Sequence, residues 1–332
     1  GQIPDFMMSV DPNLEAFLAN APIFLQPWWL EAVAPGRWDY VIVRRGGDIA
    51  AAMPYVAKQW LGWTFVEGPE KTPYLGPWLR SSTAKYANRL AEEKDLMNEL
   101  IDALPRLGAF HQTFHPGITN WLPFFWRGFQ QTTLYTYRID DPSDTDALWR
   151  ETTEGVRTDI KKARKQVTIE ADGDFGALME LRRKTWQRQG RDIPHSNEEM
   201  RALHRACQQH DCCQVLLARG SDGQLHAGAY FVWDQSSLYY YTSGADPALR
   251  GSGAGALLVW AGIDLAARLG LRFDFEGSMQ EPIERFFRSF GARQVPYFAL
   301  SQASRYPVPA VLGGLRRWKG RLENMSLRSA RS

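Results

Sequence analysis

Several features that direct proteins out of the cytoplasm or into membranes are missing from this sequence. Among its 332 residues only three are cysteine, Cys207, Cys212 and Cys213. An odd, clustered set forms no disulfide framework and is typical of a reducing interior. Residues 1–11 lack the basic segment and apolar stretch of a secretory signal. The longest stretch without Asp, Glu, Lys or Arg, 107–126, contains two prolines and two histidines, which excludes a membrane span. We therefore expect a cytoplasmic protein.

An excess of one charge is also missing. The chain has 39 Lys and Arg against 37 Asp and Glu, which excludes a uniformly basic coat for nucleic acid. Aromatic residues, by contrast, are abundant, with 17 Phe, 12 Tyr and 13 Trp. A disordered protein or a coiled coil would not have this composition. Length and composition together predict a globular enzyme or binding protein of two domains, with a large aromatic core or cleft.

One order of elements occurs twice along the chain. Each copy has a hairpin, a third strand, a long helix, a Leu-Gly pair before another strand, a short amphipathic helix and a closing strand. We expect the hairpins at 40–57 and 215–233, the long helices at 84–104 and 253–269, the Leu-Gly pairs at 107 and 269, and the closing strands at 133–139 and 295–300. The offset of about 162 positions favours an internal duplication.

The duplication predicts the fold class and the domains. Alternating strands and helices indicate α/β architecture with mixed sheets, in two tandem domains with a cleft between them. We expect domains at 1–142 and 143–306, followed by a basic tail at 307–332. In the first copy, Trp126 lies at helical spacing from Leu122 and Phe129, which predicts that this face of the short helix is buried.

A glycine-rich segment is the sharpest chemical signal. It follows a strand pattern, opens the long apolar helix of the second copy, and consists of Arg250, Gly251, Ser252, Gly253, Ala254 and Gly255. Glycines let backbone amides approach a ligand, and a helix N-terminus favours an anion such as a pyrophosphate. The alternative is a tight turn with no ligand. The missing Gly-Lys-Ser/Thr ending excludes a P-loop, and the late position in a mixed unit excludes a dinucleotide fold.

The spacing Arg250-x-x-Gly253-x-Gly255 resembles the acyl-CoA pyrophosphate loop of the GNAT acyltransferases. The doubled arrangement, with basic residues 161–165 opening the second half and 273–277 followed by 283–291, resembles the Fem-type aminoacyltransferases. Those enzymes are two fused GNAT-like domains that lengthen peptidoglycan cross-bridges from aminoacyl-tRNA. Phe287 stands where the tRNA-using members usually carry a lysine. The resemblance implies an acyltransferase with acetyl-CoA or another acyl-CoA, or aminoacyl-tRNA, as donor and an amine as acceptor.

The resemblance also implies candidate catalytic residues. Glu276 ends a strand beside the expected donor loop, where a carboxylate suits a general base or a group that holds the amine. Asp274 is expected on the same face. The alternative is that Glu276 caps the next helix or pairs with Arg285. Tyr74 and Trp78 belong to the proline-bracketed segment 72–78, which resembles a segment facing the acceptor cleft in the family. The alternative for Tyr74 is an aromatic packed in a loop.

Basic residues supply further candidates for binding. Lys161 lies in a basic cluster suited to a phosphate-bearing acceptor or a tRNA backbone, and Arg285 is one of two cations nearest to the family's lysine position. The alternative is a solvated helix face. The basic tail is interleaved with apolar residues and suits an anionic membrane surface, which would put the protein at the inner face of the membrane. The alternative there is a frayed terminus. The sequence does not define the oligomeric state.

Other chemistries find less support. His204 and Cys207 lie close together, but a second pair of ligands is missing, so we expect no metal site. Hydrolase motifs are also missing. Two hypotheses remain: an acyltransferase acting on a cell-envelope, peptidoglycan-related or small-molecule amine, and a non-catalytic glycan- or peptide-binding module on a degenerate GNAT fold.

Overall fold

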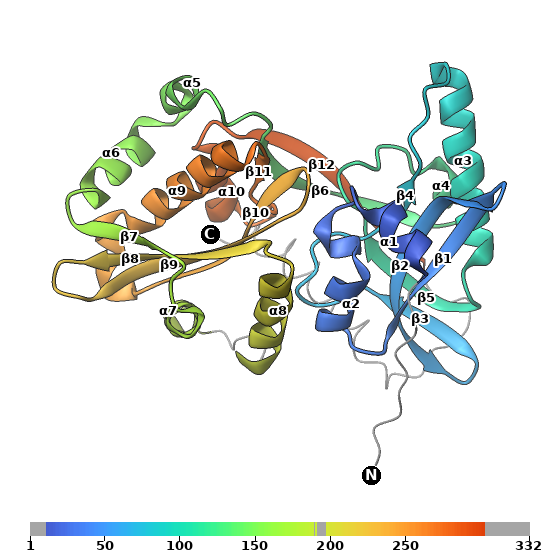
Figure 1. Ribbon diagram of the computed structural model, residues 1–332, viewed down its shortest axis with the longest axis horizontal. Helices are drawn as coiled ribbons and strands as arrows, with labels where there is room; N and C mark the ends of the chain where they lie inside the picture. Colours follow the sequence, from blue (N-terminus) through green and yellow to red (C-terminus); the bar gives the residue numbers. More distant parts are fainter. Residues whose placement is uncertain (1–10, 189, 191–196, 303–332) are drawn as a thin grey trace, which may run out of the picture. The chain divides into compact units, whose positions relative to one another are not determined.

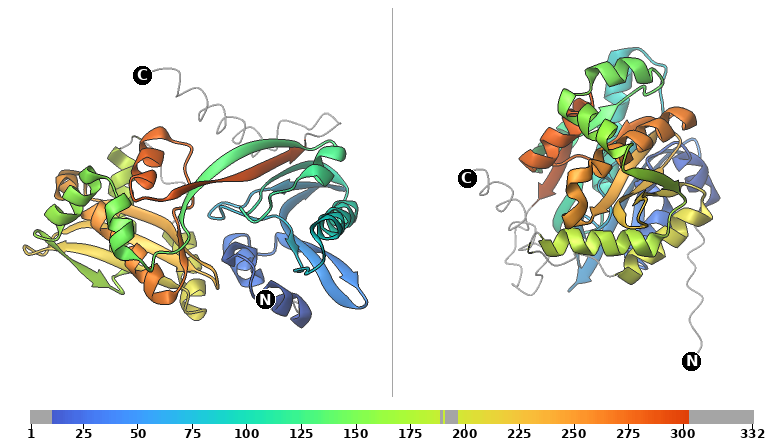
Figure 2. Two further views of the ribbon diagram at one scale, coloured as in Figure 1. Left: turned by 90° about the horizontal axis from the view of Figure 1, so that it is seen from above. Right: turned by 90° about the vertical axis from the view of Figure 1, so that its left-hand side faces the viewer.

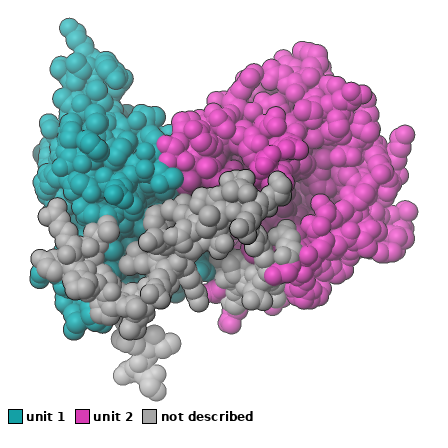
Figure 3. Space-filling model, turned by 180° about the vertical axis from the view of Figure 1, so that it is seen from behind, with its two compact units in different colours: residues 1–132, 298–309 teal, residues 133–297, 310–332 magenta. Residues whose placement is uncertain are grey.

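The structure, a computed structural model, describes residues 11–188, 190 and 197–302. Strands and helices form two compact units (Figure 3). Among the described residues, unit 1 comprises 11–132 and 298–302, and unit 2 comprises 133–297. The predicted mixed α/β class is confirmed. The expected basic tail, 307–332, lies outside the described residues.

Unit 1 is built on a mixed sheet in which one pair of strands is parallel. Its elements are α1 (Pro12–Leu18), η1 (Ile23–Leu25), α2 (Pro27–Val33), β1 (Trp38–Arg45), β2 (Asp48–Trp60), β3 (Trp63–Glu67), β4 (Trp78–Leu79), α3 (Tyr86–Ala103), β5 (Leu107–Thr113) and α4 (Leu122–Trp126). The strand order is β1-β2-β3-β5, in which β3 and β5 are parallel (Figure 1). The core is aromatic: Phe114 packs edge-on against Phe124 with ring centroids 5.0 Å apart.

The predicted buried face of α4 is wrong. Leu122 and Trp126 are 42% and 56% exposed. α4 has only five residues, and Phe124 on its other side is fully buried against the core. α4 is buried through Pro123 and Phe124, and of the predicted face only Phe129, after the helix, is buried, so helical spacing alone did not identify the inner face of so short a helix.

Unit 2 repeats the architecture with a longer sheet. Its elements are β6 (Gln130–Ile139, from Thr133 on), α5 (Thr145–Glu151), α6 (Glu154–Ala163), β7 (Val167–Ala171), α7 (Phe175–Arg188), α8 (Asn197–Gln209), β8 (Cys213–Gly220), β9 (Leu225–Trp233), β10 (Ser237–Ala245), η2 (Pro247–Ser252), α9 (Ala254–Leu269), β11 (Arg272–Asp274), α10 (Glu281–Arg288) and β12 (Arg293–Gln302, as far as Tyr297). The order is β7-β8-β9-β10-β11. α6 and α9 cover one face of the sheet, and α7 covers the other (Figure 1).

The apolar sequence of α9 follows from its position. Most of its residues are buried, and Gly262 lies where an added Cβ would come within 2.3 Å of the Phe231 ring. The helix therefore lies directly on the sheet. It begins after Gly253 and ends at Gly270, both in the left-handed conformation that glycine adopts without strain.

The register of the strands supports the duplication. In unit 2, Phe273 pairs with Ile139; in unit 1, His111 pairs with Ser301, and each residue is displaced by 162 positions. The closing strands β6 and β12 have exchanged partners, because β6 pairs with β11 and β12 with β5 (Figure 2). The compact units therefore do not coincide with the expected ranges 1–142 and 143–306.

Candidate functional site

The glycine-rich segment is fixed in place by α7. Asp246 caps η2 by accepting a hydrogen bond from the Ala248 amide at 2.9 Å, and Lys184 of α7 contacts the Asp246 carboxylate at 2.7 Å. Thr185 of α7 also exchanges hydrogen bonds with Ala245. The end of β10 and the start of the segment are therefore held to one helix, which gives the loop a defined position.

Gly253 is required by packing and not by a ligand. It has φ +78°, and an added Cβ would lie 2.3 Å from the carbonyl oxygen of Asp159 in α6. Gly251 and Gly255 differ, since both are exposed and an added Cβ at either would meet open space. The two outer glycines are therefore the ones past which a ligand has room to approach.

α9 begins with amides that its own helix does not use. The first four N–H groups of a helix have no intrahelical acceptor. The Ser252 hydroxyl accepts from the Ala254 amide at 3.3 Å, while Gly255 and Ala256 occupy the next two positions. These amides and the helix dipole provide the kind of site that binds a phosphate. The geometry predicted for the loop, with a strand before it and a helix after it, is present.

β10 and β11 form a fork next to this loop. They pair in parallel from Ser237 with Arg272 to Tyr239 with Asp274, where β11 ends. β10 continues to Ala245, so its edge from Tyr240 onward has no partner from β11. Free backbone groups on a strand edge can pair with an extended ligand. The open edge leads from the fork towards the glycine-rich loop.

Two carboxylates lie at the vertex of the fork. Asp274 is 2% exposed, and its Oδ1 accepts from the Thr136 hydroxyl at 2.6 Å and from the Glu276 amide at 2.8 Å. Burial raises the pKa of Asp274 to about 6, although these hydrogen bonds act in the opposite direction. The predicted placement of Asp274 beside Glu276 agrees with these contacts.

Glu276 is held in an unusual conformation. Its φ is +62°, in the left-handed region that non-glycine residues rarely occupy. The next residue, Gly277, has φ +78°, and an added Cβ would lie 2.4 Å from the Tyr135 carbonyl oxygen. Oε1 of Glu276 is buried without a hydrogen-bond partner in the described part of the chain. Burial, with a smaller contribution from Asp274, raises the pKa of Glu276 well above its usual value, as suits a proton acceptor.

Sequence reasoning missed two residues that face the fork. Tyr241 is the extra residue of a β-bulge, because Tyr240 pairs with Phe231 and Thr242 already pairs with Tyr230. Arg182 of α7 is 7% exposed and donates from Nε to the Thr242 hydroxyl at 3.1 Å. A bulge is not visible in an apolar strand pattern, and Arg182 is one of several basic residues in an ordinary helix. Neither left a signal in the sequence.

The other predicted residues are dispersed. Tyr74 lies in unit 1, 1% exposed, with its ring 5.8 Å from that of Phe24. Trp78 begins β4, with its ring 5.8 Å from that of His115. Lys161 is exposed on α6, about 200° around the helix from Asp159, which contacts Gly253. Arg285 is exposed and pairs with Glu281 at 2.9 Å, not with Glu276. The roles of these four residues in binding or catalysis stay predictions.

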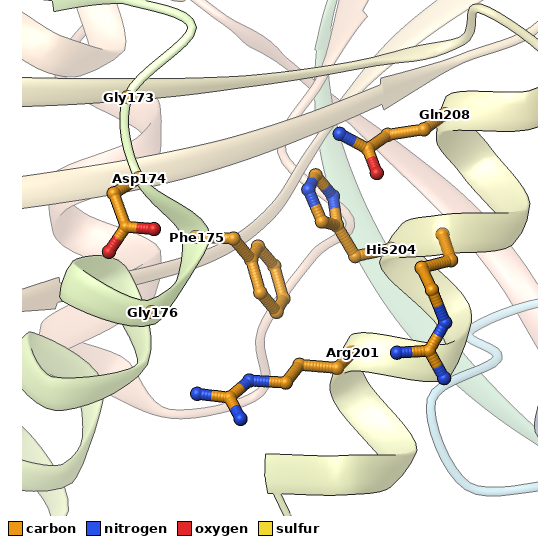
Figure 4. A pocket seen from close by; sticks show the side chains of 8 residues that line it. Gly173, Asp174, Phe175, Gly176, Arg201, His204 and Gln208 are labelled. Carbon is orange, nitrogen blue, oxygen red and sulfur yellow. The ribbon is translucent and has the colours of Figure 1, made fainter.

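A separate open pocket of about 500 Å³ lies between α7 and α8 (Figure 4). His204 stacks on Phe175 with ring centroids 4.1 Å apart, and Arg201 lines the same pocket. Burial raises the pKa of the nearby Cys213 thiol to about 11, which disfavours a thiolate. Within the described residues no three His, Cys, Asp or Glu side chains converge as metal ligands would. In that part of the chain, no helix combines the length and apolarity needed to cross a membrane.

Comparisons with known proteins agree with this geometry. Residues 150–288 match the acetyltransferase (GNAT) domain family. The fold resembles that of FemX, with a TM-score of 0.66, 14% identity and coverage of 92% of this chain and 98% of that one. The C-terminal domain of an Agrobacterium fabrum protein named as a lysylphosphatidylglycerol synthetase has a TM-score of 0.52, 12% identity and coverage of 94% and 95%.

L-PGS from Bacillus licheniformis gives a TM-score of 0.52, 13% identity and coverage of 92% and 96%. No curated protein matches the sequence. At these identities the solved structures establish the fold alone. The chain has a fold similar to that of FemX, and residues 150–288 match the acetyltransferase (GNAT) domain family.

Proposed function

We propose that the protein is an N-acyltransferase that moves an acyl or aminoacyl group from acyl-CoA or aminoacyl-tRNA to an amine. One observation carries the proposal: in unit 2, the part of β10 that extends past the end of β11 leads from the buried Glu276 to the N-terminus of α9, where Gly251 and Gly255 are exposed. A donor with phosphates at one end and a reactive carbonyl at the other fits this arrangement.

The donor phosphates would bind the amides of Gly255 and Ala256. Asp159 occupies the space beside Gly253, so the phosphates approach past Gly251 and Gly255. The extended arm of an acyl-CoA has amide groups that can pair with a strand edge, and β10 extends past the end of β11 as far as Ala245. Its thioester would then lie at the fork, close to Glu276.

The chemistry at the fork is a single acyl transfer. The amine nitrogen attacks the carbonyl carbon of the donor, and Glu276 accepts the proton that the nitrogen loses. A C–N bond forms, the C–S bond of a thioester or the C–O bond of an ester breaks, and the leaving thiol or hydroxyl regains a proton. Glu276 suits the first step because its pKa is raised. Asp274 positions it through the Glu276 amide.

The proposed acceptor is an amine of the cell envelope. The support is the shared fold with FemX and with proteins named for lysylphosphatidylglycerol synthesis. Tyr74 and Trp78 of unit 1 remain the candidate acceptor residues, together with Lys161 and Arg285 of unit 2. A lipid-linked acceptor would bring the protein to the inner face of the membrane, where the basic tail, outside the described residues, would make the contact.

The donor site is tested with CoA, acetyl-CoA and longer acyl-CoAs by thermal shift and calorimetry. Gly255→Asp places a negative charge among the amides that would bind phosphate. We expect CoA to bind about 10–100-fold more weakly to this variant. In the absence of CoA the same change should stabilise α9 by up to about 1 kcal/mol, because an acidic residue favours the first turn of a helix.

Gly255→Asn is the matched control, since it differs from Gly255→Asp in charge alone. It should retain most of the CoA affinity. Gly253 is unsuitable for this test because any side chain there meets the Asp159 carbonyl. If none of the CoA compounds raises the melting temperature of the wild-type protein, the acyl-CoA donor is rejected. The same two variants would then be compared with aminoacyl-tRNA.

A further inference from the structure

A buried arginine in unit 2 has no acidic partner. Arg182 is 7% exposed, and its one described hydrogen bond runs from Nε to the Thr242 hydroxyl at 3.1 Å. It forms no ion pair within the described residues. Its neighbours in α7 do: Arg183 contacts Glu180 (2.5 Å), and Lys184 contacts Asp246 (2.7 Å). Of these three consecutive basic residues, the least exposed one is the one without a carboxylate.

An unpaired cation at this depth is costly. The free-energy cost of removing a guanidinium from water is offset when a carboxylate pairs with it in good geometry. Thr242 offers Arg182 only a neutral oxygen. Burial correspondingly lowers the pKa of Arg182 from its usual value. A planar guanidinium whose two terminal nitrogens have no described partner is suited to bidentate binding of a carboxylate.

Arg182 contacts β10 next to the bulge, close to the fork. Successive residues of a regular strand point to opposite faces, but the bulge at Tyr241 breaks this alternation beside Thr242, which contacts Arg182 from the α7 side. Tyr239 pairs with Asp274, so Tyr241 and Glu276 are each two residues beyond the last pair of the fork. Burial raises the pKa of Tyr241 well above its usual value; Glu276 adds to this shift and Arg182 opposes it.

Arg182 therefore contacts β10 next to the bulge, Glu276 lies just past the last pair of the fork, and within the described residues the two side chains do not pair with each other. A ligand that carries a carboxylate a few bonds from an amine would satisfy both. We propose that Arg182 binds a carboxylate of the acceptor, so that the enzyme acylates an amino acid or a peptide whose amine is placed beside Glu276. This inference rests on the proposed function, because it assigns the acceptor of the same reaction.

A phosphate-bearing group fits this position less well. A second negative charge would be repelled by Asp274 and Glu276, whereas one carboxylate joined to an amine is balanced by Arg182 and Glu276 together. The donor phosphates also have their own position at the start of α9. Arg182 is thus a recognition residue for the acceptor and not part of the donor site.

The test compares amines with and without a carboxylate by calorimetry in the absence of donor. The probe pairs are glycine with methylamine, L-alanine with ethylamine, and L-lysine with cadaverine, each up to millimolar concentrations. We expect the wild-type protein to bind the carboxylate-bearing member of at least one pair 10-fold or more tightly. Arg182→Met should abolish that preference. Arg182→Lys, which keeps the charge but not the planar fork, should retain only part of it.

Arg183→Met is the matched control, because Arg183 is the next residue of α7 and pairs with Glu180 at the surface. It should keep the full preference. Preservation of the preference in Arg182→Met, or its absence from all three pairs in the wild-type protein, would overturn the proposal. CoA binding is measured separately on the same variants. Loss of CoA binding with the carboxylate preference retained would count against the donor assignment alone.

Discussion

Unit 1 and unit 2 end equivalent strands in different ways. In unit 1 the strand continues past β5, and the Phe114 amide donates to the Phe298 carbonyl at 2.7 Å. The equivalent residue of unit 2, 162 positions later, is Glu276. Its amide turns to the Asp274 side chain, and Thr136, the equivalent of Phe298, donates its hydroxyl to the same carboxylate. Unit 1 therefore has a backbone hydrogen bond between these two strands, from Phe114 to Phe298, at the position where unit 2 has a polar cluster of Thr136, Asp274 and Glu276.

The side chains differ accordingly. Gln112 of unit 1 stands where unit 2 has Asp274, and it donates to the Pro54 carbonyl at 2.8 Å. Phe114 stands where unit 2 has Glu276 and packs into the aromatic core. A neutral amide and a phenyl ring stabilise the strand end, whereas two carboxylates at the same place carry charge into a buried site. If the proposed function is correct, unit 1 kept the scaffold of the duplication and unit 2 carries its chemistry.

The helix starts show the same contrast. α9 follows Gly253 and has the exposed Gly255 in its first turn, whereas α3 follows Lys85; neither of these N-cap residues makes a side-chain capping hydrogen bond. A lysine at the start of a helix opposes the helix dipole, although its ammonium group would itself attract a phosphate. The segment before α3 contains no glycine between Arg80 and Lys85. The comparison therefore favours the proposal that the donor binds to unit 2.

The largest effect is expected from Glu276→Gln. Removing the proton acceptor should lower kcat/KM by about 10²–10⁴-fold, measured as thiol release from acyl-CoA, or as transfer from aminoacyl-tRNA, with an amine acceptor. The wild-type rate should rise with pH as Glu276 loses its proton, at pH values above the ordinary range of a glutamate because its pKa is raised. The variant should lack this dependence.

Tyr74→Phe is the counterpart in unit 1. Tyr74 is buried against Phe24, and the comparison of the units predicts a much smaller loss than for Glu276→Gln. An equal or larger loss would place essential chemistry in unit 1 and break the comparison.

The repeated order of elements in the two units and the position of the glycine-rich loop could be predicted from the sequence. The repeat was visible because apolar periodicity and the Leu-Gly pairs recur at one offset, and the loop because its glycines are local. The exchange of β6 and β12 was not visible, since both strands have the same pattern and either pairing buries the same faces. Arg182 reaches the site through a contact 60 residues away in sequence, with Thr242, which no local pattern encodes.

The next effect concerns the dependence of stability on pH. Burial raises the pKa of Asp274 to about 6 in the folded protein, against about 3.9 in an unfolded chain. The folded state therefore binds the proton more tightly, and stability falls as pH rises from about 4 to about 6. A difference of about two pKa units corresponds to about 3 kcal/mol. Asp274→Asn, which can still accept both hydrogen bonds, should lose the contribution of Asp274 to this fall in urea unfolding measured at several pH values, while the contribution of Glu276, whose pKa is also raised, remains.

Asp48→Asn is the control in unit 1, since Asp48 is an exposed carboxylate at the start of β2. It should leave the pH dependence of unfolding as in the wild-type protein. If the unfolding free energy of Asp274→Asn falls with pH as much as that of the wild-type protein, the Asp274 carboxylate does not cause the fall. The polar cluster of unit 2 would then not destabilise the fold through Asp274.

The smallest effect is expected at the start of α3. Lys85 has φ −54° and ψ 146°, the extended conformation of an N-cap residue, so Lys85→Asp can accept a hydrogen bond from the first turn and favour the helix dipole. We expect stabilisation by about 1 kcal/mol in urea unfolding, with no change in CoA affinity. Lys85→Ala removes the cation without adding a capping group, so it should stabilise the protein less than Lys85→Asp does. If Lys85→Asp weakens CoA binding, the lysine of unit 1 contributes to the donor site, and the assignment of donor binding to unit 2 alone is wrong.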